Sequence, residues 1–196
     1  MKTIPTMLCV LLATLCLPGP ARAVEEHLSP AAVRSAIVFG RAHRSQIQQA
    51  LEQRYANPSR TAYDDRFLVR TKWCKLAYLA AIEDNATEAF SVGRDAILDD
   101  HCLQIDIRVF GHSLHFARDY QVRLIRNDAE TRPCKRHADH YQVRRRPGPA
   151  TALPGYAATI RTYFPYTALQ PDAAYTLEVS APGFTRRFHL DLSAYQ

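Results

Sequence analysis

The chain of 196 residues is long enough for one domain of ordinary size or for two small ones. It holds only seven glycines, and it lacks both the glycine-rich loops that cradle phosphates or dinucleotides and the Gly-x-Ser-x-Gly motif of many hydrolases. The net charge of +6 comes mainly from arginine, since only four of the 25 basic residues are lysine. Composition and motifs therefore argue against a nucleotide-binding enzyme and against a serine hydrolase of that type.

The first 23 residues have the pattern of an export signal. Lys2 gives a short positive start, residues 7–17 form an apolar run, and Ala21-Arg22-Ala23 is the small-x-small pattern that signal peptidase recognises. A run of eleven residues is too short to cross a bilayer, which takes about 20 residues, and no longer run follows. We expect residues 1–23 to be removed as a signal peptide. The mature chain would begin near Val24, carry a net charge of about +4, have no transmembrane segment, and be periplasmic or secreted.

Helical signals lie before about residue 100. Ser29-Pro30 is a typical helix start, and an apolar stripe from Val33 to Leu51 predicts one helix that ends at Asn57-Pro58. Beyond it the sequence predicts a loop over 59–66, an extended piece at 67–69, a second helix over Lys72–Asp84 and a short third helix over 91–98. We therefore expect a helical N-terminal part over residues 24–100.

Strand signals lie after residue 100. From Leu103 to Val109 apolar residues alternate with polar ones, which is the pattern of a half-buried strand. Further strands are expected at 120–124, 140–145, 158–162, 175–179 and 184–192, with turns at Asn127-Asp128 and 181–183. Helices followed by strands indicate an α+β protein rather than a βαβ nucleotide fold. Short strands in this number suit an antiparallel β-sandwich domain over residues 101–196.

The segment Leu169-Gln170-Pro171-Asp172-Ala173-Ala174-Tyr175 resembles the Leu-x-Pro-x-x-x-Tyr corner of fibronectin type III and related immunoglobulin-like domains. This resemblance implies an immunoglobulin-like sandwich in which the Tyr175 hydroxyl bonds to backbone a few residues upstream. Because Trp73 belongs to the helical half, no tryptophan lies on an early strand, and the strand order stays open. More loosely, the chain is similar to uncharacterised secreted bacterial proteins with a Val-Arg-Thr segment, here 69–71, and a Phe-x-Leu-Asp-Leu-Ser ending, here 188–193. That similarity implies no activity.

Three cysteines remain after removal of the signal: Cys74, Cys102 and Cys134. Thiols of exported proteins meet an oxidising compartment, so one internal disulfide can form and one thiol is left over. Cys102 begins the first predicted strand of the sandwich and Cys134 follows the second, whereas Cys74 lies on a helix beside Trp73. We predict a disulfide between Cys102 and Cys134, with Cys74 as a buried, inert thiol.

Histidines and acids offer candidate groups for metal binding or catalysis. The pairs His112/His115 and His137/His140 have the spacing that puts two rings on one helix face, but neither pair lies in a predicted helix. Asp99-Asp100-His101-Cys102 combines a carboxylate, an imidazole and a thiol, yet adjacent residues rarely reach the geometry of a catalytic cysteine. We predict no catalytic residue, no metal ligand and no cofactor.

Basic residues are densest between residues 132 and 146. Arg132, Arg136, Arg144, Arg145 and Arg146 suit contacts to phosphates or other anions, although the acids among them also fit a solvated loop. Our first hypothesis is an exported, non-enzymatic protein whose immunoglobulin-like module binds a protein or an envelope polymer in an adhesion or accessory role. The alternatives are a polyanion-binding envelope protein that uses these arginines and a hydrolase with a site built from distant residues. Nucleic acid is not expected as a partner.

Overall fold

The computed structural model describes residues 24–57, 65–114, 116–142, 155–182 and 184–195. Within these ranges the chain has four α-helices and eight β-strands, which confirms the predicted α+β class. The helices are α1 (Pro30–Ala42), α2 (Ile47–Tyr55), α3 (Lys72–Ile82) and α4 (Glu88–Leu98). The strands are β1 (Arg66–Arg70), β2 (Cys102–Gly111), β3 (Gln121–Arg126), β4 (Ala129–Thr131), β5 (Lys135–Gln142), β6 (Tyr156–Pro165), β7 (Ala174–Ala181) and β8 (Phe184–Asp191).

The strands form two antiparallel four-stranded sheets. Sheet A has the order β1-β2-β6-β5 and sheet B has the order β4-β3-β7-β8. Alternate side chains of both sheets meet in one apolar core, as expected of a sandwich. The fully buried members include Val69, Leu103, Ile105, Ile107, Phe164, Leu124, Leu177 and Leu190. The predicted alternation from Leu103 to Val109 thus places its apolar residues in this core.

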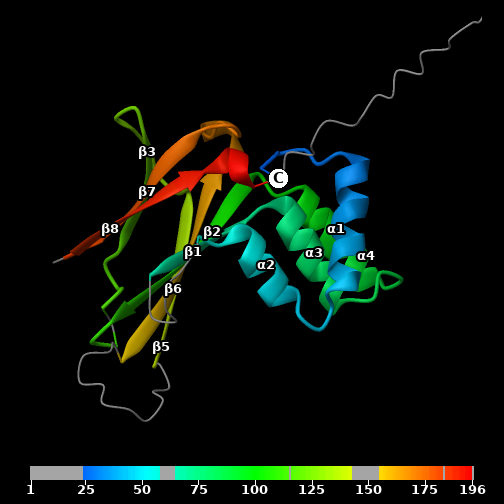
Figure 1. Ribbon diagram of the computed structural model, residues 1–196, viewed down its shortest axis with the longest axis horizontal. Coiled ribbons are helices and arrows are strands. Elements are labelled where there is room, and N and C mark those ends of the chain that lie inside the picture. The colour runs from blue at the N-terminus through cyan, green and yellow to red at the C-terminus, as the bar shows by residue number, and fades with distance from the viewer. Residues whose placement is uncertain (1–23, 58–64, 115, 143–154, 183, 196) are drawn as a thin grey trace, which may run out of the picture.

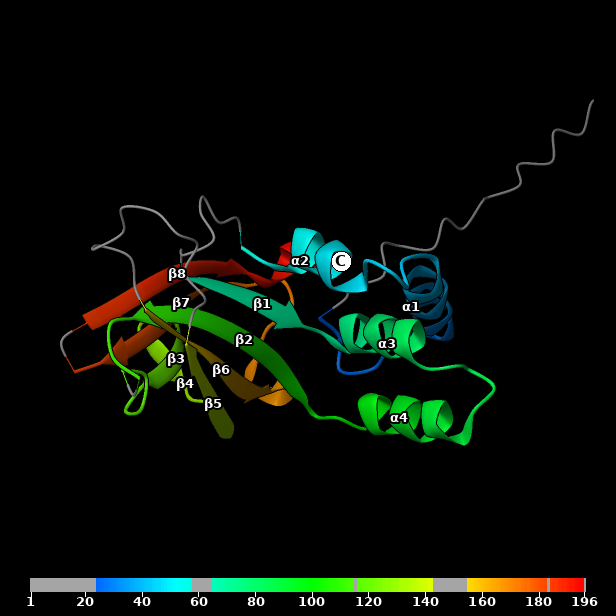
Figure 2. The ribbon, with the colours of Figure 1, turned by 90° about the horizontal axis from the view of Figure 1, so that it is seen from below.

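The helices gather on one side of the sandwich, with α2 beside β1 (Figures 1 and 2). Their own core is a second cluster that includes Leu51, Tyr55, Trp73 and Leu76, and Leu68 of β1 reaches into it from the outer face of sheet A. Val24, which precedes α1 in the sequence, is buried in the sandwich core. None of the described helices has the length and apolar character needed to cross a membrane.

The predicted single helix from Ser29 to Asn57 is wrong, because the chain turns between Ala42 and Ile47. The apolar stripe is real, but its two halves pack on α3 from separate helices. Helices α1 and α3 approach so closely at Gly40 that an added Cβ would lie 2.0 Å from the carbonyl oxygen of Ala77. This close packing fixes the direction of α1, and a turn is needed for α2 to reach β1.

Several boundaries also differ from the prediction. Helix α4 begins one turn before Ser91, since the Thr87 hydroxyl accepts the N–H of Phe90 and caps the helix there. Strand β5 begins at Lys135 rather than His140, and residues 143–145 lie outside the described ranges. The predicted turn at Asn127-Asp128 is present, with positive φ at both residues, as in a two-residue hairpin. That hairpin creates β4, which was not predicted.

Candidate functional site

The outer face of sheet A carries three rows of side chains, because residues paired across antiparallel strands point to the same face. The rows are Arg66, Arg108, Thr159 and Asp139; Leu68, Asp106, Arg161 and His137; and Arg70, Gln104, Tyr163 and Lys135. Five of these twelve residues are arginine or lysine and two are aspartate. This face of the sheet is therefore cationic.

A groove of about 240 Å³ runs along this face where helix α2 stands beside the sheet. Gln48, Glu52 and Ala56 line it from α2 and the residue after it. The sheet contributes Arg66, Phe67, Leu68, Arg70, Asp106, Arg108, Thr159 and Arg161. Four guanidinium groups thus line one groove together with two carboxylates.

Helix α2 is fixed against the sheet by the backbone that follows it. The N–H of Asn57 donates to the carbonyl oxygen of Phe67 over 3.1 Å, and the N–H of Phe67 donates to the Asn57 side chain over 2.5 Å. Ala56 also pairs with Leu68 as an isolated β-bridge. Leu51 and Tyr55 are buried in the helical core. Both walls of the groove are therefore held by backbone bonds and packing.

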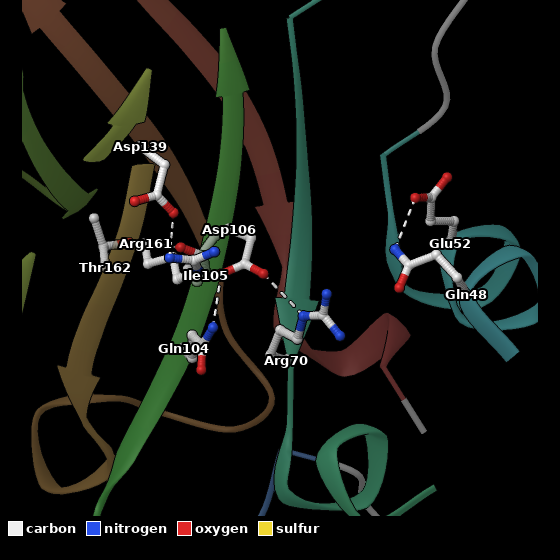
Figure 3. Close-up of polar contacts among 9 residues, drawn as sticks. All are labelled: Gln48, Glu52, Arg70, Gln104, Ile105, Asp106, Asp139, Arg161 and Thr162. Carbon is white, nitrogen blue, oxygen red and sulfur yellow. Dashed lines mark hydrogen bonds and ion pairs between the residues drawn. The ribbon is translucent and has the colours of Figure 1, made fainter. Parts of the chain in front are cut away.

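Ion pairs orient Arg66, Arg70 and Arg161 in the groove. Arg70 Nε lies 2.9 Å from Asp106 Oδ2, and Gln104 donates to the other oxygen of Asp106 over 2.7 Å (Figure 3). Burial opposes the charge of Arg70, but the neighbouring Asp106 carboxylate outweighs it and raises the pKa of Arg70. The guanidinium is therefore charged and held in one orientation.

The other two pairs lie at the edges of the groove. Arg66 Nη1 is 3.3 Å from Glu52 Oε2, and Glu52 in turn accepts a hydrogen bond of 2.9 Å from Gln48. Arg161 pairs with Asp139 of β5 (Figure 3). A guanidinium has five N–H donors, so a single ion pair leaves others available to a ligand.

The arginines predicted to bind anions lie elsewhere. Arg132 is 82% exposed and 3.7 Å from Glu130, and Arg136 donates to the backbone oxygen of Tyr120. Both line a second pocket of about 390 Å³, between the start of β3 and the segment that leads into β5. Arg144, Arg145 and Arg146 lie outside the described residues. The structure therefore joins Arg132 and Arg136 to one pocket and leaves the groove on sheet A to other arginines.

The residues of the corner segment lie between sheets A and B. The Tyr175 ring is 5% exposed, and its hydroxyl accepts a hydrogen bond of 2.8 Å from the N–H of Gln170. Leu169 is buried in the sandwich core, while Pro171 is exposed.

Within the described ranges, Cys74, Cys102 and Cys134 are free. Cys102 Sγ and Cys134 Sγ lie 3.4 Å apart, which is a contact and not a covalent bond. Cys74 is buried on α3, where burial raises the pKa of its thiol to about 12.

The candidate metal and catalytic groups are dispersed. His137 pairs with Asp139 over 2.8 Å, and His101 pairs with Glu26 over 2.9 Å. His112 is exposed, and His115 lies outside the described residues. Asp100 forms an ion pair of 2.6 Å with Lys75. In the part of the chain that the structure describes, no three His, Cys, Asp or Glu residues come together as a metal site would require.

The groove arginines were missed because Arg108 and Arg161 occupy ordinary polar positions of alternating strands, whereas Arg66 and Arg70 flank the short extended piece 67–69. Their convergence depends on the pairing of β1 with β2 and of β2 with β6, which no local pattern specifies. The alternation itself was a usable signal, since it assigns Asp106, Arg108 and Arg161 to the solvent side of their strands. Scans against protein-family models, curated proteins and solved structures found no match.

Proposed function

We propose that the protein is an exported, non-enzymatic binding protein that holds an anionic polymer of the cell envelope on the outer face of sheet A. The observation that carries this proposal is the convergence of Arg66, Arg70, Arg108 and Arg161 along one groove. The proposal keeps the polyanion hypothesis and assigns it to arginines other than those between residues 132 and 146. Export rests on the pattern of residues 1–23, which lie outside the described residues.

The chemistry of the lining favours an anion. Arginine presents a planar fork of N–H donors that matches sulfate, phosphate and carboxylate groups. Four such forks outnumber the two carboxylates of the lining, Glu52 and Asp106. On binding an anionic ligand, these arginines would replace hydrogen bonds to water with charge-assisted hydrogen bonds to the ligand, and the fold would stay unchanged.

The cationic surface extends beyond the groove toward β5, which suits a polymer better than a small ion. Lys75 and Lys135 both lie near the Tyr163 ring, 5.9 Å and 5.5 Å from its centre. Strands are spaced about 4.8 Å apart, so the four strands of sheet A span about 15 Å. Several repeating anionic groups of one chain fit within that width.

We also propose that the sandwich is immunoglobulin-like. If the strands are lettered along the chain, the spatial order of sheet A becomes A-B-E-D, as in that fold. The spatial order of sheet B becomes C′-C-F-G. Tyr175 then stands near the start of strand F, and its bond to Gln170 has the geometry of a tyrosine corner. Because the fold serves many binding proteins, it agrees with a binding role but does not identify the ligand.

The test is binding of a size-defined heparin oligosaccharide to the chain that begins at Val24. The groove variant is Arg66→Gln/Arg161→Gln, because both side chains are partly exposed and their partners Glu52 and Asp139 are too. The control is Arg34→Gln/Arg118→Gln, which makes the same change in net charge at exposed positions away from the groove. We expect the groove variant to bind about tenfold more weakly or worse, and the control to change affinity less than about twofold.

Equal losses in the two variants would show that only net charge matters. No loss in the groove variant would place the binding site elsewhere. Either result would overturn the proposal.

A further inference from the structure

Cys102 and Cys134 stand on either side of the end of β6. Cys102 is the first residue of β2 and pairs with Pro165 at the end of β6, and Cys134 comes one residue before β5 on the other side. Their Sγ atoms are 3.4 Å apart although the residues are 32 positions apart in the sequence. Cys134 is exposed and Cys102 is half-buried.

Backbone hydrogen bonds hold both cysteines in place. The N–H of Cys134 donates to the carbonyl oxygen of Tyr163 over 2.9 Å, and its thiol also lies 3.3 Å from that oxygen. The N–H of Cys102 donates to the carboxylate of Asp100 over 3.0 Å. These bonds fix the backbone positions from which the two sulfur atoms meet.

We propose that Cys102 and Cys134 are a redox pair that is oxidised to a disulfide by exchange with a disulfide-bearing oxidant, either a protein or glutathione disulfide. This proposal does not depend on anion binding by the groove. Cys74 takes no part, because it is buried on α3 away from solvent.

The exchange has two steps. Cys134 loses its proton and attacks one sulfur of the oxidant, so that a mixed disulfide forms and the other sulfur leaves as a thiolate. Cys102 then loses its proton and attacks Cys134 Sγ, which forms the internal disulfide and releases the second thiolate. Two electrons pass to the oxidant, the two released protons neutralise its thiolates, and it leaves as a dithiol or as two thiols.

The surroundings favour Cys134 as the residue that attacks first. It lines the pocket of about 390 Å³ together with Arg123, Arg132, Lys135 and Arg136. These cations attract the carboxylates of glutathione disulfide, and the exposed Cys134 thiol is open to it. Burial and the contact with Cys134 raise the pKa of the Cys102 thiol to about 11, which suits the second, resolving role.

The experiment starts from the chain that begins at Val24, fully reduced and then exposed to glutathione disulfide. Free thiols are alkylated in denaturant and the protein is analysed by mass spectrometry and peptide mapping. We expect three alkylated thiols before oxidation, one afterwards, and a linked peptide that joins Cys102 to Cys134. The oxidised form should melt about 10 °C above the reduced form, because the bridge closes a long loop in the unfolded chain.

Variants distinguish the roles of the cysteines. Cys102→Ser should accumulate one glutathione on Cys134, because the resolving thiol is missing. Cys74→Ser is the matched control and should still form the internal bridge. Three free thiols after oxidation of the folded protein, or a bridge that contains Cys74, would overturn the proposal.

Discussion

The backbone N–H of Gln170 donates a hydrogen bond of 2.8 Å to the Tyr175 hydroxyl where the chain crosses from sheet A to sheet B. The donor lies five residues before the acceptor, in the segment that connects β6 to β7. Since the Tyr175 ring is buried, this bond has little competition from water. It ties the crossover to the start of β7 and so fixes one end of the sandwich.

Removal of the Tyr175 hydroxyl should therefore destabilise the fold. Tyr175→Phe leaves the N–H of Gln170 without its partner, and the expected loss is about 1–3 kcal/mol in the free energy of unfolding. Tyr78→Phe is the control, because Tyr78 lies on the exposed side of α3 and should change stability little. Urea unfolding of both variants measures the difference. If Tyr175→Phe unfolded at the urea concentration of the parent, the corner would contribute nothing to stability.

Glu178 links three strands across the outer face of sheet B. It is 2% exposed and bonds to Arg123 of β3 and Arg187 of β8, each at 2.7 Å. Glu178→Gln removes the charge that both guanidinium groups share, and we expect a loss of about 1–3 kcal/mol. Glu83→Gln changes the same residue type at the end of α3 and serves as the control. Equal stability of the two variants in thermal unfolding would contradict the assigned role of Glu178.

Acid should weaken the fold through the same residue. The hydrogen bond from Arg187 lowers the pKa of Glu178 below its ordinary value of 4.5. Burial opposes this effect, and the hydrogen bond from Arg123 adds to the lowering. A carboxyl group with a lowered folded-state pKa stabilises the protein above its unfolded pKa, and that stability is lost as the pH falls through the folded pKa. The melting temperature should therefore fall below about pH 4.5.

The pH dependence has its own internal control. The melting temperature of Glu178→Gln should be lower than that of the parent at neutral pH. It should also fall less steeply as the pH drops, because Gln does not titrate. The hydrogen bonds from Ser193 also lower the pKa of Asp191, so part of the acid dependence should persist. If the melting temperatures of parent and variant differed by the same amount at every pH between 3 and 7, Glu178 would contribute nothing to the pH dependence of stability.

Export predicts a defined new terminus. N-terminal sequencing of the exported protein should begin at or near Val24, as the pattern of residues 1–23 predicts. Recovery of only the full-length chain from the cytosol of an exporting host would contradict removal of residues 1–23.

Local sequence patterns correctly predicted a helix cap, a strand and a turn. The Ser29 cap, the alternation after Leu103 and the Asn127-Asp128 turn are each set by neighbouring residues, and the structure contains all three. The pairing of β1 with β2 and the turn after Ala42 depend on packing between distant segments. No short stretch of sequence therefore predicts them.

The candidate site shows the same division. Cys102 and Cys134 were paired in the prediction because both were expected at one end of the sandwich. Their sulfur atoms lie 3.4 Å apart, while the disulfide itself stays a prediction. Arg66 and Arg161 share a face only through β2, which lies between their strands. A dense run of charge in the sequence was easier to recognise than four arginines that only the sheet register assembles.

The central claim is that an anionic polymer binds along the outer face of sheet A. An NMR titration of the isotope-labelled chain from Val24 with a heparin oligosaccharide tests it residue by residue. We predict that the largest amide shifts fall on β1, β2, β6 and α2, around Arg70 and Arg161. In Arg66→Gln/Arg161→Gln the same shifts should need about tenfold more ligand or fail to saturate. Shifts centred on residues 121–136, at the second pocket, or an unchanged spectrum at saturating ligand, would contradict the claim.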